Sequence, residues 1–181
     1  RLRMEKKIAV FCSASNDIDQ EYNKVARSFV RAASLCGYTI VSGGTIKGTM
    51  GEISKEIASC GGSHIGIVPE FMKGIEAPEL TEIVWTDTMS ARQAKMREGT
   101  VAAVALPGGI GTLDELIETL TQKKLGFYGG RIYALDWNGF YKPLEMLLDH
   151  YVKTGMLEKR HREMIHFCSV PEGILESLEN D

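Results

Sequence analysis

The sequence has no apolar run of 18 residues, no excess of basic residues and no closely spaced cysteine pair, and each absence excludes a class of protein. Without such a run we expect no membrane span, and the first apolar run, which ends at Cys12, is too short for a signal peptide. The 21 basic and 24 acidic residues give a net charge of −3, so we expect no nucleic-acid partner. These absences together predict a cytoplasmic protein.

Cysteines and histidines are few and scattered. Three of the four cysteines lie in apolar stretches, so we interpret them as buried thiols in a reducing compartment. The four histidines show no paired spacing such as HExxH, so we expect no metal site. With 44% apolar and 25% charged residues, the chain has the composition of one globular domain, spanning residues 1–181. The cysteines are Cys12, Cys36, Cys60 and Cys168.

Short β-rich runs alternate with longer helical patterns along the chain. Single helices between apolar strands predict an α/β fold, a doubly wound Rossmann-like parallel sheet with helices on both faces. The residues between the third and fourth strands, 70–81, are expected to form a loop. Strands are expected at 8–12, 38–41, 64–69, 82–86, 101–106 and 131–137. Helices are expected at 19–35, 51–60, 90–98, 113–125 and 140–153, with two short ones before Phe167 and after Pro171.

Three strand-to-helix turns are rich in small residues, at 12–16, 42–51 and 107–115. Glycines let backbone N–H groups approach an anion, and a helix N-terminus favours negative charge there. Neither GxGxxG nor GxxxxGK[ST] is present, so a dinucleotide fingerprint and a P-loop are both unsupported. The alternative is that these glycines only form tight turns. In the third turn, the hydroxyl of Thr112 is placed to cap the following helix.

Glu115 and Arg92 are the candidate catalytic residues. Glu115 falls in the first turn of a helix that we expect to begin at Thr112, where the helix dipole favours the ionised carboxylate at neutral pH. The alternative is an acid that only stabilises the helix, a role for which Asp114 is the better candidate. Arg92 lies on the helix at 90–98 and is suited to bind phosphate or carboxylate, whereas Lys95 and Arg97 are expected on a solvated face.

The segment PGGIGTLDE at 107–115 matches the PGGxGTxxE motif of the Lonely Guy family of cytokinin riboside 5′-monophosphate phosphoribohydrolases. The resemblance covers nearly the whole chain, because FCSAS at 11–15, the second glycine turn and IVPEF at 67–71 also resemble family segments. The sequence departs from the family at Gln93, where the MxxRK motif has lysine, and at Thr45 and Thr49 in the second turn.

The resemblance implies hydrolysis of a nucleoside 5′-monophosphate to free base and ribose 5-phosphate, without a cofactor, by a homodimer. It places the catalytic pair on Arg92 and Glu115. The carboxylate would stabilise an oxocarbenium-like sugar and orient water, while the third turn holds the phosphate. Together with the glycine turns, it assigns nucleotide contacts to Ser15, Gly43, Gly44, Glu76, Gly108, Gly109, Ile110, Gly111, Thr112 and Thr121.

Two other functions were weighed against the hydrolase. One is a non-catalytic nucleotide- or cofactor-binding carrier on the same fold, which has no need of a buried acid at the sugar. The other is a pyridoxal-phosphate decarboxylase, for which no lysine lies in a suitable context. The sequence leaves open whether the substrate is a cytokinin nucleotide, AMP or another monophosphate. The helix at 113–125 and the segment 89–97 carry more apolar residues than are needed to cover one face of the sheet, which is a hint of dimerisation. These residues are Met89, Met96, Leu116 and Leu120.

Overall fold

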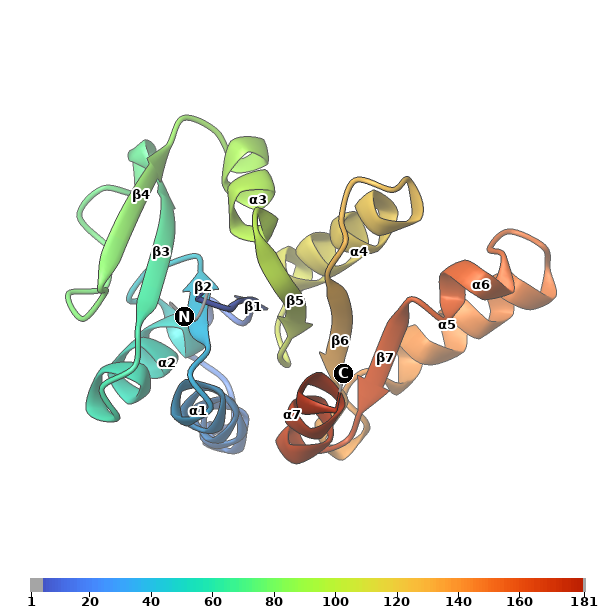
Figure 1. Ribbon diagram of the computed structural model, residues 1–181, viewed down its shortest axis with the longest axis horizontal. Helices are drawn as coiled ribbons and strands as arrows, with labels where there is room; N and C mark the ends of the chain where they lie inside the picture. The colour runs from blue at the N-terminus through green and yellow to red at the C-terminus, as the bar shows by residue number, and fades with distance from the viewer. Residues whose placement is uncertain (1–4, 181) are drawn as a thin grey trace.

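Seven parallel strands form one sheet in the computed structural model, which describes residues 5–180 (Figure 1). The strand order is β4-β3-β2-β1-β5-β6-β7, and it reverses between β1 and β5. In a doubly wound sheet, this switch point opens a crevice at the carboxyl ends of the strands. The expected doubly wound parallel sheet is therefore confirmed. The strands are β1 (Lys7–Phe11), β2 (Thr39–Ser42), β3 (His64–Pro69), β4 (Glu82–Thr86), β5 (Thr100–Ala105), β6 (Arg131–Leu135) and β7 (Ile165–Cys168).

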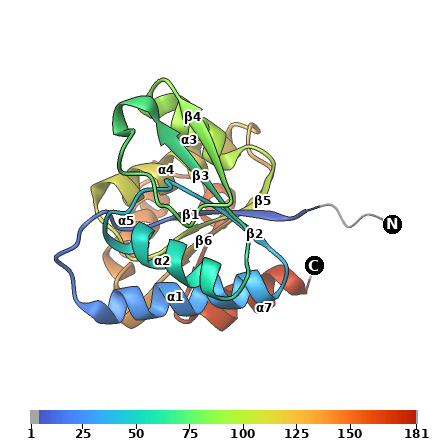
Figure 2. The same cartoon turned by 90° about the vertical axis from the view of Figure 1, so that its left-hand side faces the viewer.

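Helices cover both faces of the sheet. On one face, α1, α2 and α7 enclose a core with Phe29, while α3, α4 and α5 enclose a second core around Met96 and Leu116 on the other. Figure 2 shows α1, α2 and α7 below the sheet and α3 and α4 above it. The helices are α1 (Gln20–Leu35), α2 (Gly48–Ser59), α3 (Met89–Arg97), α4 (Ile110–Lys124), α5 (Lys142–Lys153), α6 (Lys159–Arg162) and α7 (Pro171–Glu179), with short 3₁₀ turns at Glu70–Met72 and Trp137–Gly139.

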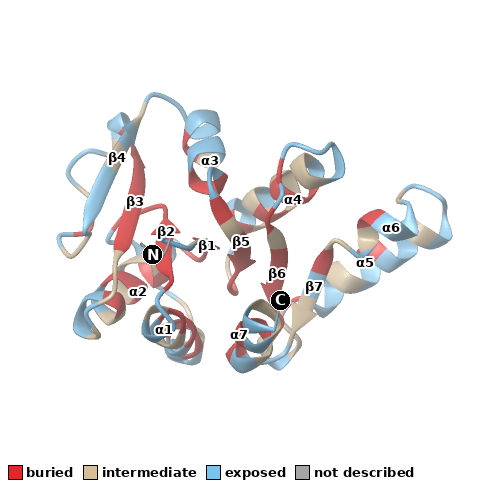
Figure 3. Cartoon of the chain, in the orientation of Figure 1, coloured by how far each residue is buried: buried red, intermediate tan, exposed pale blue. Residues whose placement is uncertain are grey.

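Local sequence signals explain the start and end of α1. The carboxylate of Asp19 accepts a hydrogen bond from the Glu21 N–H at 3.0 Å, which caps the helix. Gly37, just beyond the helix, has a φ of +90°, a conformation that favours glycine. In the sheet, β1, β2 and β3 are almost wholly buried, whereas β4 at the edge is exposed over much of its length (Figure 3).

Several expectations from the sequence are wrong at the level of elements. The strand β7 was missed because four residues at a sheet edge, half of them only partly buried, carry no clear period. Both α2 and α4 begin three residues earlier than expected, since their first turns contain glycine that we interpreted as loop. Only Cys12 is a buried thiol, while Cys36 is exposed and the other two cysteines are partly exposed.

The apolar residues taken as a hint of dimerisation are mostly core residues. Met96 on α3 and Leu116 and Leu120 on α4 are buried, and only Met89 of these four residues is exposed. They therefore say nothing about a partner chain. Separately, no helix of the part that the structure describes is long and apolar enough to cross a membrane.

Candidate functional site

A cavity of about 420 Å³ opens at the carboxyl edge of the sheet, beside the switch point between β1 and β5. The loops after β1, β2 and β5 supply its walls together with the first turns of α3 and α4. Most of the residues expected to form the site meet here. Those that line the cavity are Ser15, Arg92, Gly109, Ile110, Gly111, Thr112 and Glu115.

Arg92 is a buried guanidinium held by two backbone carbonyls. Its Nε donates to the carbonyl oxygen of Ile67 at 2.9 Å, and its Nη2 donates to that of Gly43 at 2.7 Å. Carbonyl groups fix the orientation of the side chain without neutralising it, so its positive charge acts on the cavity. Burial lowers the pKa of Arg92, and the nearby Glu115 opposes that shift.

The turn after β2 is shaped around Arg92. A Cβ atom on Gly43 would lie 2.2 Å from Nη2 of Arg92, so only glycine fits there. The Ser42 hydroxyl accepts from the Gly44 N–H at 3.1 Å and lies 2.6 Å from Nε2 of the buried His64. Neither glycine lines the cavity: Gly43 positions Arg92 through its carbonyl, while Gly44 packs against Gly66 of β3.

Glu115 faces the cavity from the second turn of α4, because the helix begins at Ile110 rather than Thr112. Burial raises the pKa of its carboxyl to about 7; Arg92 lowers it, while Asp114 and Glu118 raise it further. The expectation that the helix dipole favours the ionised carboxylate at neutral pH does not hold, because burial favours the neutral form. The helix terminus is a turn away, and the dipole falls off within the first turn, so desolvation outweighs it.

Arg92 and Glu115 form no direct ion pair within the described chain, although each shifts the pKa of the other. The two groups therefore face the same cavity with space between them. Burial and Glu115 also raise the pKa of the Cys12 thiol, which lines the cavity floor next to both groups. No sequence signal had assigned Cys12 to the site.

The N-terminus of α4 presents backbone donors to the cavity. The first helical hydrogen bond runs from the Leu113 N–H to the Gly109 carbonyl at 3.0 Å, which leaves the preceding three amides outside the helical ladder. A Cβ atom on Gly109 or Gly111 would meet no atom within 4 Å, so both glycines border open space. This terminus is suited to bind an anion.

Thr112 does not cap α4, contrary to the expectation. Gly109 occupies the N-cap position, and the Thr112 hydroxyl is buried without a hydrogen-bond partner among the described residues. A Cβ atom on Gly108 would lie 2.2 Å from this hydroxyl oxygen, so Gly108 leaves room for Thr112. Gly108 itself supports the turn and does not line the main cavity.

Two side-chain bridges join α3 to α4 around Arg92 and Glu115. The Gln93 Nε2 donates to Asp114 Oδ2 at 2.7 Å, at the cavity wall. Deeper along the helices, Arg97 Nη1 lies 3.1 Å from Glu118 Oε1. Arg97 is therefore buried and paired, and the expectation of a solvated position was wrong, whereas Lys95 is exposed as expected.

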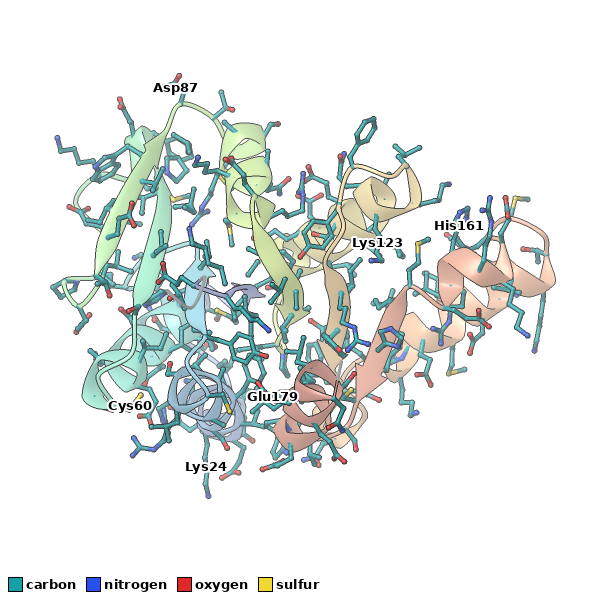
Figure 4. All side chains as sticks on the ribbon, viewed as in Figure 1. Lys24, Cys60, Asp87, Lys123, His161 and Glu179 are labelled. Carbon is teal, nitrogen blue, oxygen red and sulfur yellow. The ribbon has the colours of Figure 1, made fainter. Side chains whose placement is uncertain are left out.

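Two of the expected nucleotide contacts lie outside the cavity. Thr121 is exposed further along α4, near Lys123, which Figure 4 labels, and its hydroxyl donates to the Ile117 carbonyl at 2.9 Å. Glu76 accepts from the Gly74 N–H at 2.6 Å and pairs through its backbone with Thr45. Neither side chain lines the cavity.

One wall of the cavity is apolar, which the sequence did not reveal. The side chains come from four separate elements and loops, so no periodic pattern joins them. Among the described residues, no group of three or more histidine, cysteine or acidic side chains is arranged to hold a metal. The apolar wall consists of Met50, Met72, Ile75 and Met89.

Comparison with known proteins identifies the family. A family model described as possible lysine decarboxylase matches residues 50–178. A cytokinin riboside 5′-monophosphate phosphoribohydrolase of Rhodococcoides fascians is 32% identical over 97% of this chain and 90% of its own length, and one of Arabidopsis thaliana is 30% identical over 96% and 83%. The solved structure of the molybdenum cofactor carrier protein of Chlamydomonas reinhardtii has a TM-score of 0.74 at 18% identity over 97% of both chains, which shows a shared fold. The chain therefore belongs to the Lonely Guy family, whose model carries the lysine decarboxylase description.

Proposed function

We propose that the chain hydrolyses the N-glycosidic bond of a nucleoside 5′-monophosphate, releasing the free base and ribose 5-phosphate. The observation that carries this proposal is the placement of Arg92 and Glu115 on one cavity, beside the free amides of α4. Relatives at about 30% identity over nearly the full chain carry the name of this activity. Cytokinin riboside monophosphates and AMP are the proposed substrates.

The N-terminus of α4 is the proposed phosphate site. Amides of Ile110, Gly111 and Thr112 point from the helix terminus, and the open side of Gly109 gives an anion room to approach. The hydroxyl of Ser15 lies on the facing loop after β1. Anchoring the phosphate here fixes the ribose between the turn and Glu115.

Glu115 acts on the sugar in the proposed reaction. As the C1′–N bond breaks, its electron pair leaves with the base, and positive charge develops on the ribose ring. The carboxylate stabilises that charge and orients a water molecule, whose oxygen bonds to C1′ and keeps one hydrogen as the C1′ hydroxyl, while its other proton goes to the leaving base. Arg92 holds the nucleotide and keeps a fraction of Glu115 ionised at neutral pH.

The apolar wall supports a base with an apolar substituent. Methionine side chains adapt to irregular shapes, and three of them border the cavity with Ile75. A purine bearing an alkyl group would bury that group against this wall, whereas the unsubstituted base of AMP would leave it in contact with water. We therefore expect cytokinin nucleotides to be preferred over AMP.

The test is incubation with a panel of nucleoside monophosphates, including AMP and a cytokinin nucleotide, followed by chromatography for free base. We expect Glu115→Gln to lower turnover by about 10²-fold or more, because it keeps the shape but removes the charge. The matched control is Glu172→Gln, which changes an exposed acid in the first turn of α7. Binding without release of base from any member would instead support a nucleotide carrier.

We also propose that the protein is a cytoplasmic homodimer. An apolar stripe follows the outer side of α4 from Ile110, which is 83% exposed, through Leu113 and Ile117 to Leu125, which is 56% exposed. Such a stripe on a helix favours pairing with a second copy. The four cysteines are free thiols, which is consistent with a reducing compartment.

A further inference from the structure

A second, smaller cavity of about 180 Å³ lies on the other side of the phosphate turn. It shares Ser13, Ser15 and Gly109 with the main cavity, so the two cavities adjoin at the loops after β1 and β5. Its remaining walls are mostly apolar and include two aromatic rings. These walls are Ile18, Tyr22, Pro107, Gly108 and Phe140.

The aromatic walls are held in place by the surrounding structure. The rings of Tyr22 and Phe140 meet edge to face with centroids 5.6 Å apart. Phe140 packs in the same way on Tyr141 at 4.9 Å, and the Tyr141 hydroxyl donates to the Leu106 carbonyl at 2.7 Å. Because Leu106 immediately precedes the Pro107–Gly108 turn, the same network that fixes the phosphate turn also shapes the small cavity.

The junction between the two cavities is polar. It contains the hydroxyls of Ser13 and Ser15 and the open side of Gly109, next to the N-terminus of α4. A ligand that spans both cavities therefore needs an anionic group in its middle and a compact apolar group at one end. In the proposed function, the nucleoside occupies the side that holds Arg92 and Glu115.

We propose that the small cavity binds a ring-bearing substituent carried on the substrate phosphate, so that the enzyme also accepts nucleoside 5′-phosphodiesters. Dinucleotides joined through phosphate belong to this chemical class. The inference rests on the proposed function, since it needs the phosphate at the N-terminus of α4. The reacting bond is unchanged: water adds across C1′–N, the base leaves with a proton, and the ribose 5-phosphate retains its ester.

The test compares the phenyl and methyl esters of adenosine 5′-monophosphate, which carry the same charge and differ only in the apolar group. We expect the phenyl ester to bind about tenfold more tightly by calorimetry, because its ring is buried against Tyr22 and Phe140. In Phe140→Ala, the ratio of the two affinities is expected to fall to about twofold or less. The matched control is Phe127→Ala, at the opposite end of α4, which should keep the ratio near ten.

The outcomes separate this inference from the proposed function. Equal affinities for the two esters in the unmodified protein, or weaker binding of the phenyl ester, would overturn the small cavity as a binding site even if monophosphates are hydrolysed. A preference for the phenyl ester that depends on Phe140 would support the site even if no base is released. The comparison in the unmodified protein needs no variant, so a misfolded Phe140→Ala would not block it.

Discussion

At the scale of single residues, the site combines the buried charge of Arg92 with the partly buried charge of Glu115, and the two compensate each other only in part. The guanidinium of Arg92 bonds to uncharged carbonyls, and the carboxyl of Glu115 has a pKa of about 7 because burial outweighs the attraction of Arg92. A carboxylate that is poorly solvated before the reaction interacts strongly with positive charge developing on the sugar. The same burial that disfavours ionisation therefore favours catalysis.

The pKa of Glu115 predicts how the rate depends on pH. Since the ionised carboxylate is the proposed active form, kcat/KM should rise as pH increases through about 7 and level off above it. The residual kcat/KM of Glu115→Gln should not show this rise. A kcat/KM that is flat between pH 5.5 and 8.5, in a range where the protein stays folded, would contradict the prediction.

The same shift predicts a change in stability. The carboxyl of Glu115 has a pKa of 4.5 in the unfolded chain and about 7 in the folded protein. Below pH 4.5 it is mainly protonated in both states, whereas between pH 4.5 and about 7 it is mainly ionised only in the unfolded chain. The free energy of unfolding therefore falls across this window, and the loss persists above it. Glu115→Gln lacks the loss, so at pH 8 it should be more stable than the unmodified protein by on the order of 2 kcal/mol.

Denaturant unfolding at pH 8 and pH 4.5 measures this difference. At pH 4.5 the stability advantage of Glu115→Gln should nearly vanish, because the carboxyl of Glu115 in the unmodified protein is then largely neutral, like the amide that replaces it. Glu172→Gln removes an exposed acid from the first turn of α7, so at pH 8 it should be less stable than the unmodified protein by about 0.3–1 kcal/mol, the opposite sign to Glu115→Gln. An advantage that is equal at the two pH values would mean that the amide stabilises by packing and not by removing a charge.

Two adjacent glycines of the phosphate turn should respond differently to valine. Gly109 borders open space, so Gly109→Val should fold normally but lower nucleotide affinity by about tenfold or more, since the side chain enters the anion site. Gly108→Val should destabilise the fold by about 1–3 kcal/mol, because its side chain meets Thr112. Calorimetric binding and thermal unfolding of the two variants check this contrast, and equal effects on both would contradict it.

At the scale of elements, the sequence predicts what depends on local patterns. The alternation of strands and helices follows from local rules and lies largely where it was expected. The start of α4 could not be predicted in this way, because a glycine in the first turn of a helix is equally typical of a loop. The pairing of Arg97 with Glu118 also escaped prediction, since it depends on how α3 packs against α4 and not on either segment alone.

That ion pair should couple α3 and α4, the helices that carry Arg92 and Glu115. The side chains of Arg97 and Glu118 are 10% and 29% exposed, so solvent screens their attraction less than at the surface. A double-mutant cycle with Arg97→Met and Glu118→Gln should give a coupling energy of about 1 kcal/mol or more. The control cycle uses Lys95 and Glu98, whose side chains are 44% and 66% exposed, and should give about 0.5 kcal/mol or less.

Equal coupling in the two cycles would show that burial does not strengthen the Arg97–Glu118 pair. Chemical denaturation of the single and double variants supplies the required free energies of unfolding. Lys95 and Glu98 are a suitable comparison because they lie in and just after the same helix, α3, but face solvent.

At the scale of the whole molecule, the two faces of the sheet have different roles. The face covered by α1, α2 and α7 holds a closed apolar core, while the face covered by α3 and α4 also carries Arg92, Glu115 and the apolar stripe on α4. Because the stripe begins at Ile110, which lines the cavity, pairing of two copies through α4 would place their sites next to the interface. Catalysis and assembly then depend on the same helix.

This arrangement predicts a dimer that is sensitive to charge on α4. Light scattering at micromolar concentration should give twice the chain mass of 20.0 kDa, and the double variant Ile117→Glu with Leu125→Glu should shift the mass toward one chain. In a symmetric dimer the stripe of one copy faces the same stripe of the other, so each introduced glutamate appears on both sides of the interface. Repulsion between these carboxylates then adds to the loss of buried apolar surface. Leu35→Glu, which changes an exposed leucine at the end of α1, should leave the mass unchanged. A mass of one chain for the unmodified protein would refute the dimer, and a dimer that both variants leave intact would place its interface away from α4.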